Sequence, residues 1–155
     1  MIDQPRARVT MWIEASPLDV FDAFVEPDRL AEFWLSKADA PLAIGRTVRW
    51  RFMVEGAEAQ ATATVMERGK RLAWDWGESH VDIALEPFDG GTAVTLVNDR
   101  FNQPGMTPVE SALNATEGFA IVLCDLKTLL ESGKSAGLTK GKARLIEARS
   151  ALSGG

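Results

Sequence analysis

The chain has 155 residues, of which 46% are hydrophobic and 25% are charged, and its formal net charge at pH 7 is −5. These values are ordinary for one globular domain with a substantial core, and the negative charge argues against a nucleic-acid partner. The longest apolar run, residues 119–124, is far shorter than the ~20 residues needed to span a bilayer, so we expect no membrane span. The single cysteine, Cys124, excludes an internal disulfide and favours a cytoplasmic location.

The first third of the chain predicts a strand followed by two short helices. Residues 6–14 alternate between apolar and polar side chains, which is typical of a half-buried strand. Ser16 and Pro17 suit the N-cap and the first position of a helix, because a serine hydroxyl can accept a backbone N–H and proline needs no donor there. A second short helix is expected to begin at Pro27.

From Gly45 onward we predict five strands, in residues 46–55, 59–68, 71–76, 80–86 and 92–101. Turn residues such as the Asp89-Gly90 pair separate them, as in an antiparallel sheet. A long helix with a broad apolar stripe follows the loop of residues 102–108 and is expected to end at Gly133, with Asp125 on its solvent side. The predicted fold class is α+β: one strand, two helices, five strands and one long helix, with the curved antiparallel sheet wrapped around that helix.

The last residues differ in charge from the rest of the chain. Residues 134–155 carry five basic side chains against one acidic side chain, Glu147. We expect a domain of residues 1–133 and a basic C-terminal tail of residues 134–155, with one more short helix starting near Thr139. The tail could lie on the acidic body of its own chain or of a partner, and a solvated, fraying helix would show the same composition.

Two segments of the sequence resemble a known family. They are ASPLDVFDAFVEPDRLAEFW, residues 15–34, and EGFAIVLCDLKTLLESG, residues 117–133. Together they resemble the START-like superfamily (also called SRPBCC or helix-grip), and within it the Aha-type group related to the activator of the heat-shock chaperone ATPase. The positions that match the patterns of this group are Pro17, Val20, Ala23, Pro27, Leu30, Phe33, Trp34, Gly118, Phe119, Leu123, Leu126, Lys127, Leu130, Glu131 and Gly133.

The resemblance covers about residues 6–133 and implies a helix-grip fold with a cavity between the sheet and the long helix. The superfamily includes lipid carriers, polyketide cyclases and cochaperone domains, so the resemblance is specific for fold and not for function. The sequence departs from the group at NDRFNQPG, residues 98–105, and again after Gly133. Both departures lie where a pocket mouth or a dimer contact would be.

Aromatic side chains are the first candidates for the walls of this cavity. Small alanines at positions 59, 61 and 63 would leave space under a facing helix. Tryptophan supplies a large apolar surface with one donor, but the same side chains would also suit a packed core, and the sequence leaves both roles open. The candidate ligand-binding side chains of this apolar set are Trp34, Trp50, Phe52, Trp74, Trp76, Phe119 and Leu123.

Two polar residues at the end of the last strand complete the predicted site. Asn98 and Arg100 continue the inward row of Val94 and Leu96, and a buried arginine must be paired or face a wet cavity. Arg100 would then anchor an anionic or carbonyl group of a ligand, with Asn98 beside it. Alternatively, the strand end turns both side chains outward, or Arg100 pairs with Asp99 or with Glu117 of the long helix.

No sequence motif for metal, nucleotide or nucleophilic chemistry is found, and no metal or cofactor is predicted. The only histidine, His80, falls opposite the apolar face of its strand, so we expect it to point to solvent and to take no part in catalysis. The sequence offers no convincing general base, so catalytic residues stay unassigned.

The function that these features favour is binding of a small hydrophobic or amphipathic molecule, without evident catalysis. Two alternatives stay open. One is an enzyme of polyketide-cyclase or hydrolase type, in which Asn98, Asp99 or Arg100 orients a carbonyl group. The other is a cochaperone-like interaction protein. A homodimer is compatible with each of these functions.

Overall fold

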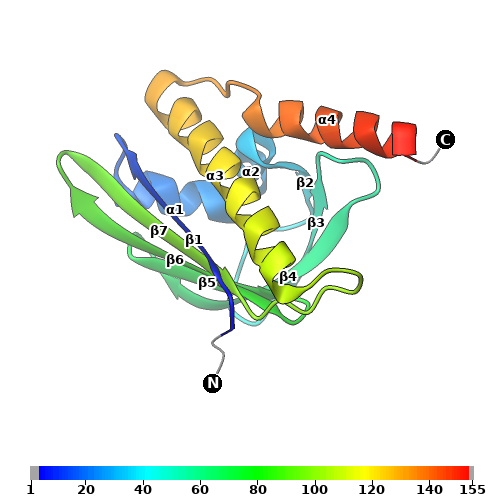
Figure 1. Cartoon of the computed structure of the whole chain (residues 1–155). Coiled ribbons are helices and arrows are strands. Elements are labelled where there is room, and N and C mark those ends of the chain that lie inside the picture. The colour runs from blue at the N-terminus through cyan, green and yellow to red at the C-terminus, as the bar shows by residue number, and fades with distance from the viewer. Residues whose placement is uncertain (1–3, 154–155) are drawn as a thin grey trace.

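The computed structural model describes residues 4–153, which form a seven-stranded antiparallel sheet and four helices (Figure 1). The strand order is β1-β7-β6-β5-β4-β3-β2, so the first two strands of the chain are the two edges of the sheet. In chain order the elements are β1 (Ala7–Ile13), α1 (Pro17–Val25), α2 (Pro27–Phe33), β2 (Leu35–Ala38), β3 (Thr47–Phe52), β4 (Glu58–Glu67), β5 (Arg71–Trp76), β6 (Ser79–Phe88), β7 (Gly91–Asp99), α3 (Pro108–Ser132) and α4 (Leu138–Ser153).

The two short helices α1 and α2 connect one edge of the sheet to the other and begin where the sequence predicts. The Ser16 hydroxyl accepts a hydrogen bond from the Asp19 N–H at 3.1 Å, and Pro17 takes the first position of α1. Pro27 opens α2 directly after α1 ends. Both helices bury their apolar sides, with Phe24 of α1 and Leu30 of α2 almost completely covered.

The long helix α3 lies across the curved sheet (Figure 1). A capping box defines its start: the Thr107 hydroxyl accepts a hydrogen bond from the Glu110 N–H, and the Glu110 carboxylate accepts one from the Thr107 N–H, both at 3.1 Å. Gly133 ends the helix with a φ of 83°, a left-handed conformation that glycine adopts at little steric cost. The predicted end of this helix is therefore confirmed.

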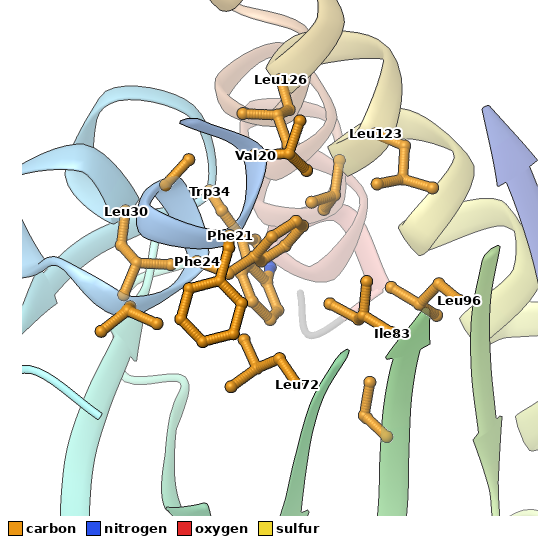
Figure 2. Packing of buried hydrophobic residues seen from close by; sticks show 14 of the residues in the cluster. Val20, Phe21, Phe24, Leu30, Trp34, Leu72, Ile83, Leu96, Leu123 and Leu126 are labelled. Carbon is orange, nitrogen blue, oxygen red and sulfur yellow. The ribbon is translucent and has the colours of Figure 1, made fainter. Parts of the chain in front are cut away.

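The main core lies between the sheet and the helices α1 and α3 (Figure 2). Leu123 and Leu126 of α3 are fully buried in this core, and the ring of Phe24 of α1 packs against those of Phe33, Trp34 and Trp74. Complete burial of a side chain of this size stabilises the fold by roughly 1.5–3 kcal/mol. Buried members that line up from successive strands are Leu72 of β5, Ile83 of β6 and Leu96 of β7.

The α+β fold class is confirmed, although the sheet has one strand more than the sequence predicted. The additional strand, β2, has four residues, follows α2 directly and pairs with β3 with an irregular register. Leu35 is its only fully buried residue, while Ser36 and Lys37 are exposed, so no apolar alternation marks this strand. Among residues 4–153, no helix combines the length and the apolar character needed to cross a membrane.

Candidate functional site

A cavity of about 890 Å³ lies between the sheet, α3 and α4. The sheet contributes side chains from β3 to β7, among them Phe52, Trp76 and Asn98. The opposite walls come from α3, through residues such as Phe119, and from α4, through residues such as Ala143. A volume of this size lies within the range of about 300–1,000 Å³ that is typical of small-molecule pockets. The cavity that the resemblance implied is therefore present.

Aromatic rings make up one side of this cavity. Trp34, the residue after α2, lies at the centre, with its ring centroid 5.2 Å from that of Trp50, 5.7 Å from that of Phe119 and 5.9 Å from that of Trp76. The rings of Trp76 and Phe119 are stacked, with 5.9 Å between centroids and an angle of 28°. Because each ring contacts several others, the cluster forms a continuous apolar surface. Trp34, Phe52, Trp76 and Phe119 line the cavity.

Three other predicted binding residues lie in the core beneath that surface. Trp50, Trp74 and Leu123 are each 0% exposed, and the cavity wall does not include them. Trp50 and Trp74 pack edge to face, with 5.2 Å between ring centroids and an angle of 74°. The two roles that the sequence left open, pocket wall and core filling, are thus divided among different members of the aromatic set.

Asn98 lines the cavity and is 2% exposed, as the alternation along β7 predicted. Its Nδ2 donates a hydrogen bond to the backbone carbonyl oxygen of His80 on β6, at 2.9 Å. This bond identifies the nitrogen end of the amide, and the amide oxygen therefore faces away from the His80 carbonyl. Asn98 is thus a buried polar side chain in a wall that combines aromatic and small residues with polar residues such as Gln60 and Gln103.

The prediction that Arg100 also points inward is wrong. β7 ends at Asp99, and Arg100 has a φ of 60°, so the chain turns out of the sheet and the alternation of side chains no longer applies. The Arg100 side chain is exposed and is not part of the cavity wall. Glu117, one of the partners considered for it, forms an ion pair with Lys142 of α4.

A buried carboxylate holds α4 against α3. Asp125 is 1% exposed, which corrects the prediction that it faces solvent. Its Oδ1 accepts a hydrogen bond from the Ser135 hydroxyl at 2.6 Å, and its Oδ2 accepts one from the backbone N–H of Thr139 at 3.2 Å. The Thr139 hydroxyl in turn donates to the backbone carbonyl oxygen of Phe33, at 2.8 Å. The negative charge also interacts favourably with the positive end of the α4 dipole.

These contacts make α4 a wall of the cavity. Thr139, Lys142, Ala143 and Ile146 of this helix all line it. The hydrogen bond and the charge of Lys142 lower the pKa of the Glu117 carboxyl below its ordinary value of 4.5. The positive charge of Lys142 is therefore compensated by a carboxylate of the neighbouring helix.

Sequence reasoning missed the small residues of α3 that leave room for the cavity. Ser111, Ala115, Gly118 and Val122 follow one another at spacings of three or four residues, share one face of α3 and line the cavity. A Cβ atom added at Gly118 would meet no neighbouring atom within 4 Å, so the space beside it is open. The signal was present in the sequence, because small residues occupy positions where a helix packed on a sheet usually carries larger apolar side chains.

His80 lies outside the cavity wall. Its Nδ1 is 2.6 Å from Oδ1 of Asp75 on the adjacent strand, and its side chain is 20% exposed, so it is half-buried and not fully exposed as predicted. Within the described part of the chain, no group of three or more His, Cys, Asp and Glu side chains is arranged to hold a metal ion.

Comparisons with known proteins agree with this architecture. The family model described as Activator of Hsp90 ATPase homolog 1-like protein matches residues 14–131. A crystal structure of a protein from Staphylococcus saprophyticus is similar, with a TM-score of 0.73 and 27% sequence identity, over 84% of this chain and 94% of that chain. Curated protein sequences give no match.

Two further solved structures share the fold at lower identity. The solution structure of the Aha1 dimer from Colwellia psychrerythraea has a TM-score of 0.74 and 20% identity, over 87% of this chain and 100% of that chain. The crystal structure of DynU16, a protein in the dynemicin biosynthetic locus, has a TM-score of 0.73 and 23% identity, over 86% of this chain and 49% of that chain. The resemblance stated from residues 15–34 and 117–133 is confirmed, and α4 lies beyond the region that the family model matches.

Proposed function

We propose a ligand-binding function for this chain, which belongs to the family of Activator of Hsp90 ATPase homolog 1-like proteins. The ligand is a small hydrophobic or amphipathic molecule, and it occupies the cavity between the sheet, α3 and α4. The observation that carries this proposal is the space of about 890 Å³ beside Gly118, opposite the rings of Trp34 and Trp76.

The shape and lining of the cavity support binding. Sites for small molecules are concave and lined mainly by apolar and aromatic side chains with a few polar groups. Here the small side chains of α3 leave a large volume open against an aromatic surface. A ligand that fills it removes apolar surface from water, which contributes roughly 25 cal/mol for each Å² buried.

A thermal-shift screen tests the proposal. The compounds are fatty acids, flat aromatic polyketides, sterols and short aromatic acids, and the proteins are the wild type and Gly118→Leu. A ligand at 100 times its dissociation constant stabilises the native state by ~2.7 kcal/mol, which is a rise in Tm of roughly 5–10 °C for a domain of this size. The leucine of Gly118→Leu would extend into the cavity, because nothing else fills that space, and the shift should disappear.

The matched control is Gly141→Leu. Gly141 lies on α4, is exposed and also has no atom within 4 Å of an added Cβ, but it does not line the cavity. This variant should therefore keep the ligand-induced shift of the wild type. A shift that survives in Gly118→Leu would place the ligand elsewhere, and no shift with any compound would favour the interaction-protein alternative. Turnover of a carbonyl compound would instead favour the enzyme.

We propose in addition that the chain forms a homodimer. Val109 and Leu113 of α3 are 58% and 68% exposed, and Leu145 of α4 is 44% exposed, so large apolar side chains face solvent beside the cavity. A neighbour in fold was solved as a dimer, which supports the proposal. Sedimentation equilibrium of the wild type and Leu113→Glu tests it: the wild type should have twice the monomer mass, and the variant should be a monomer. A monomeric wild type would refute it.

A further inference from the structure

The cavity wall contains two almost completely buried, uncharged polar side chains, Asn98 and Ser111. Asn98 is 2% exposed and lies near the end of β7, and Ser111 is 4% exposed and lies in the first turn of α3. Both line the same cavity and flank the same loop, residues 100–107. We propose that they form a subsite for an uncharged hydroxyl or carbonyl group of the ligand. This inference rests on the proposed binding function and specifies the class of ligand.

The Ser111 hydroxyl gives the stronger support for this subsite. Other hydroxyl side chains of α3 donate to the carbonyl oxygen four residues earlier: Thr116 to Ala112 at 2.7 Å, and Thr128 to Cys124 at 2.9 Å. The Ser111 Oγ is buried and has no hydrogen-bond partner among the described residues. A buried hydroxyl without a partner is unfavourable, and a ligand group that reaches it removes this penalty.

Asn98 supplies complementary hydrogen-bonding groups. One N–H of its amide is occupied by the carbonyl oxygen of His80, and this bond fixes the orientation of the side chain. The second N–H can donate to a carbonyl oxygen, and the amide oxygen can accept from a hydroxyl group. A serine hydroxyl both donates and accepts, so Asn98 and Ser111 together match either a hydroxyl or a carbonyl group.

The charges around the cavity argue against an ionised ligand group at this position. The charged side chains of the described wall are Glu58, Glu78 and Lys142, of which Glu58 pairs with Arg51 and Lys142 pairs with Glu117. A carboxylate at the subsite would therefore find no unpaired cation among the described residues of the wall. A cation beside Asn98 and Ser111 would itself be a buried, unpaired charge. An uncharged polar group avoids both penalties.

The test uses three compounds that share one ring system: 2-naphthol, 2-methylnaphthalene and 2-naphthoate. Tryptophan fluorescence follows binding, because Trp34 and Trp76 line the cavity. We expect the wild type to bind 2-naphthol about two- to twelvefold more tightly than 2-methylnaphthalene, as one neutral hydrogen bond provides, and 2-naphthoate most weakly. Ser111→Ala should abolish the preference for 2-naphthol and leave the affinity for 2-methylnaphthalene unchanged.

Thr116→Ala is the matched control, since Thr116 is on the same helix and also carries a hydroxyl, but this hydroxyl already donates to the Ala112 carbonyl oxygen and Thr116 is not part of the cavity wall. It should keep the preference for 2-naphthol, and Asn98→Leu should lose it. Tightest binding of 2-naphthoate, or a preference that persists in Ser111→Ala, would overturn the inference while leaving the binding function intact. Binding of none of the three compounds to the wild type would overturn the inference and the binding function together.

Discussion

Replacing Asp125 with alanine is expected to release α4 from the body of the protein. Asp125 is 1% exposed and accepts hydrogen bonds from the Ser135 hydroxyl and the Thr139 N–H. Each hydrogen bond to a charged group contributes roughly 1.5–3 kcal/mol, but the freed donors of the exposed Ser135 and the half-buried Thr139 regain bonds to water. We therefore expect a net loss of about 2 kcal/mol and a decrease in Tm of about 4–8 °C.

Hydrogen exchange measured by mass spectrometry distinguishes local release of α4 from global unfolding. An isolated helix of the length of α4 is only marginally stable in water. The backbone amides of α4 should therefore exchange much faster in Asp125→Ala, while those of α3 keep most of their protection. Asp125→Asn is the control, because it retains the shape and an acceptor oxygen but lacks the charge, and it should show an intermediate effect. If the α4 amides of Asp125→Ala exchange as slowly as those of the wild type, the anchoring role of Asp125 is refuted.

Three further predictions concern α3. Gly118→Ala should raise the stability by roughly 0.5–1 kcal/mol in urea unfolding, because the added methyl group meets open space and alanine favours a helix over glycine. Leu123→Ala should lower it by roughly 2–5 kcal/mol, since Leu123 is fully buried in the core, and a smaller loss would contradict that assignment. The pKa of Glu131 is lowered from its ordinary value of 4.5 by a hydrogen bond from the Glu14 N–H and then by Lys127. Its carboxylate therefore stabilises the fold above that value and loses this effect as the pH falls through the lower, folded-state pKa. The Tm of Glu131→Gln should be below that of the wild type at pH 7, and the difference should vanish in acid.

The sequence correctly predicted the helix ends that are set by residues close together in the chain. Ser16 with Pro17 marked the start of α1, and Gly133 marked the end of α3, because caps are formed by residues close in sequence. The alternation of side chains along the last strand correctly predicted that Asn98 faces inward. The same rule wrongly predicted an inward orientation for Arg100, two residues later. The alternation rule holds only while the backbone is extended, and no residue before Arg100 indicates that its φ becomes positive.

The remaining features depend on contacts that are distant in sequence. Asp125 looked solvent-exposed on the pattern of α3 alone, and it is buried because α4 returns to cover it. β2 forms because β3 provides a pairing edge for four residues without an apolar pattern of their own. The aromatic set was identified from the sequence, but which of its members line the cavity and which fill the core depends on how Trp34 packs against Trp50 and Trp76.

Because of the position of α4, the main core and one wall of the cavity are formed by different segments of the chain. The main core is complete before residue 133 and the family match ends at residue 131, yet one wall of the cavity is formed by Thr139, Lys142, Ala143 and Ile146 of α4. Substitutions in α4 can reshape that wall while the main core, which includes no described residue of α4, keeps its packing. Evolution can thus change the shape of the cavity and the stability of the core through different segments of the chain, and grafting the last helix of one relative onto another is a route to a reshaped cavity.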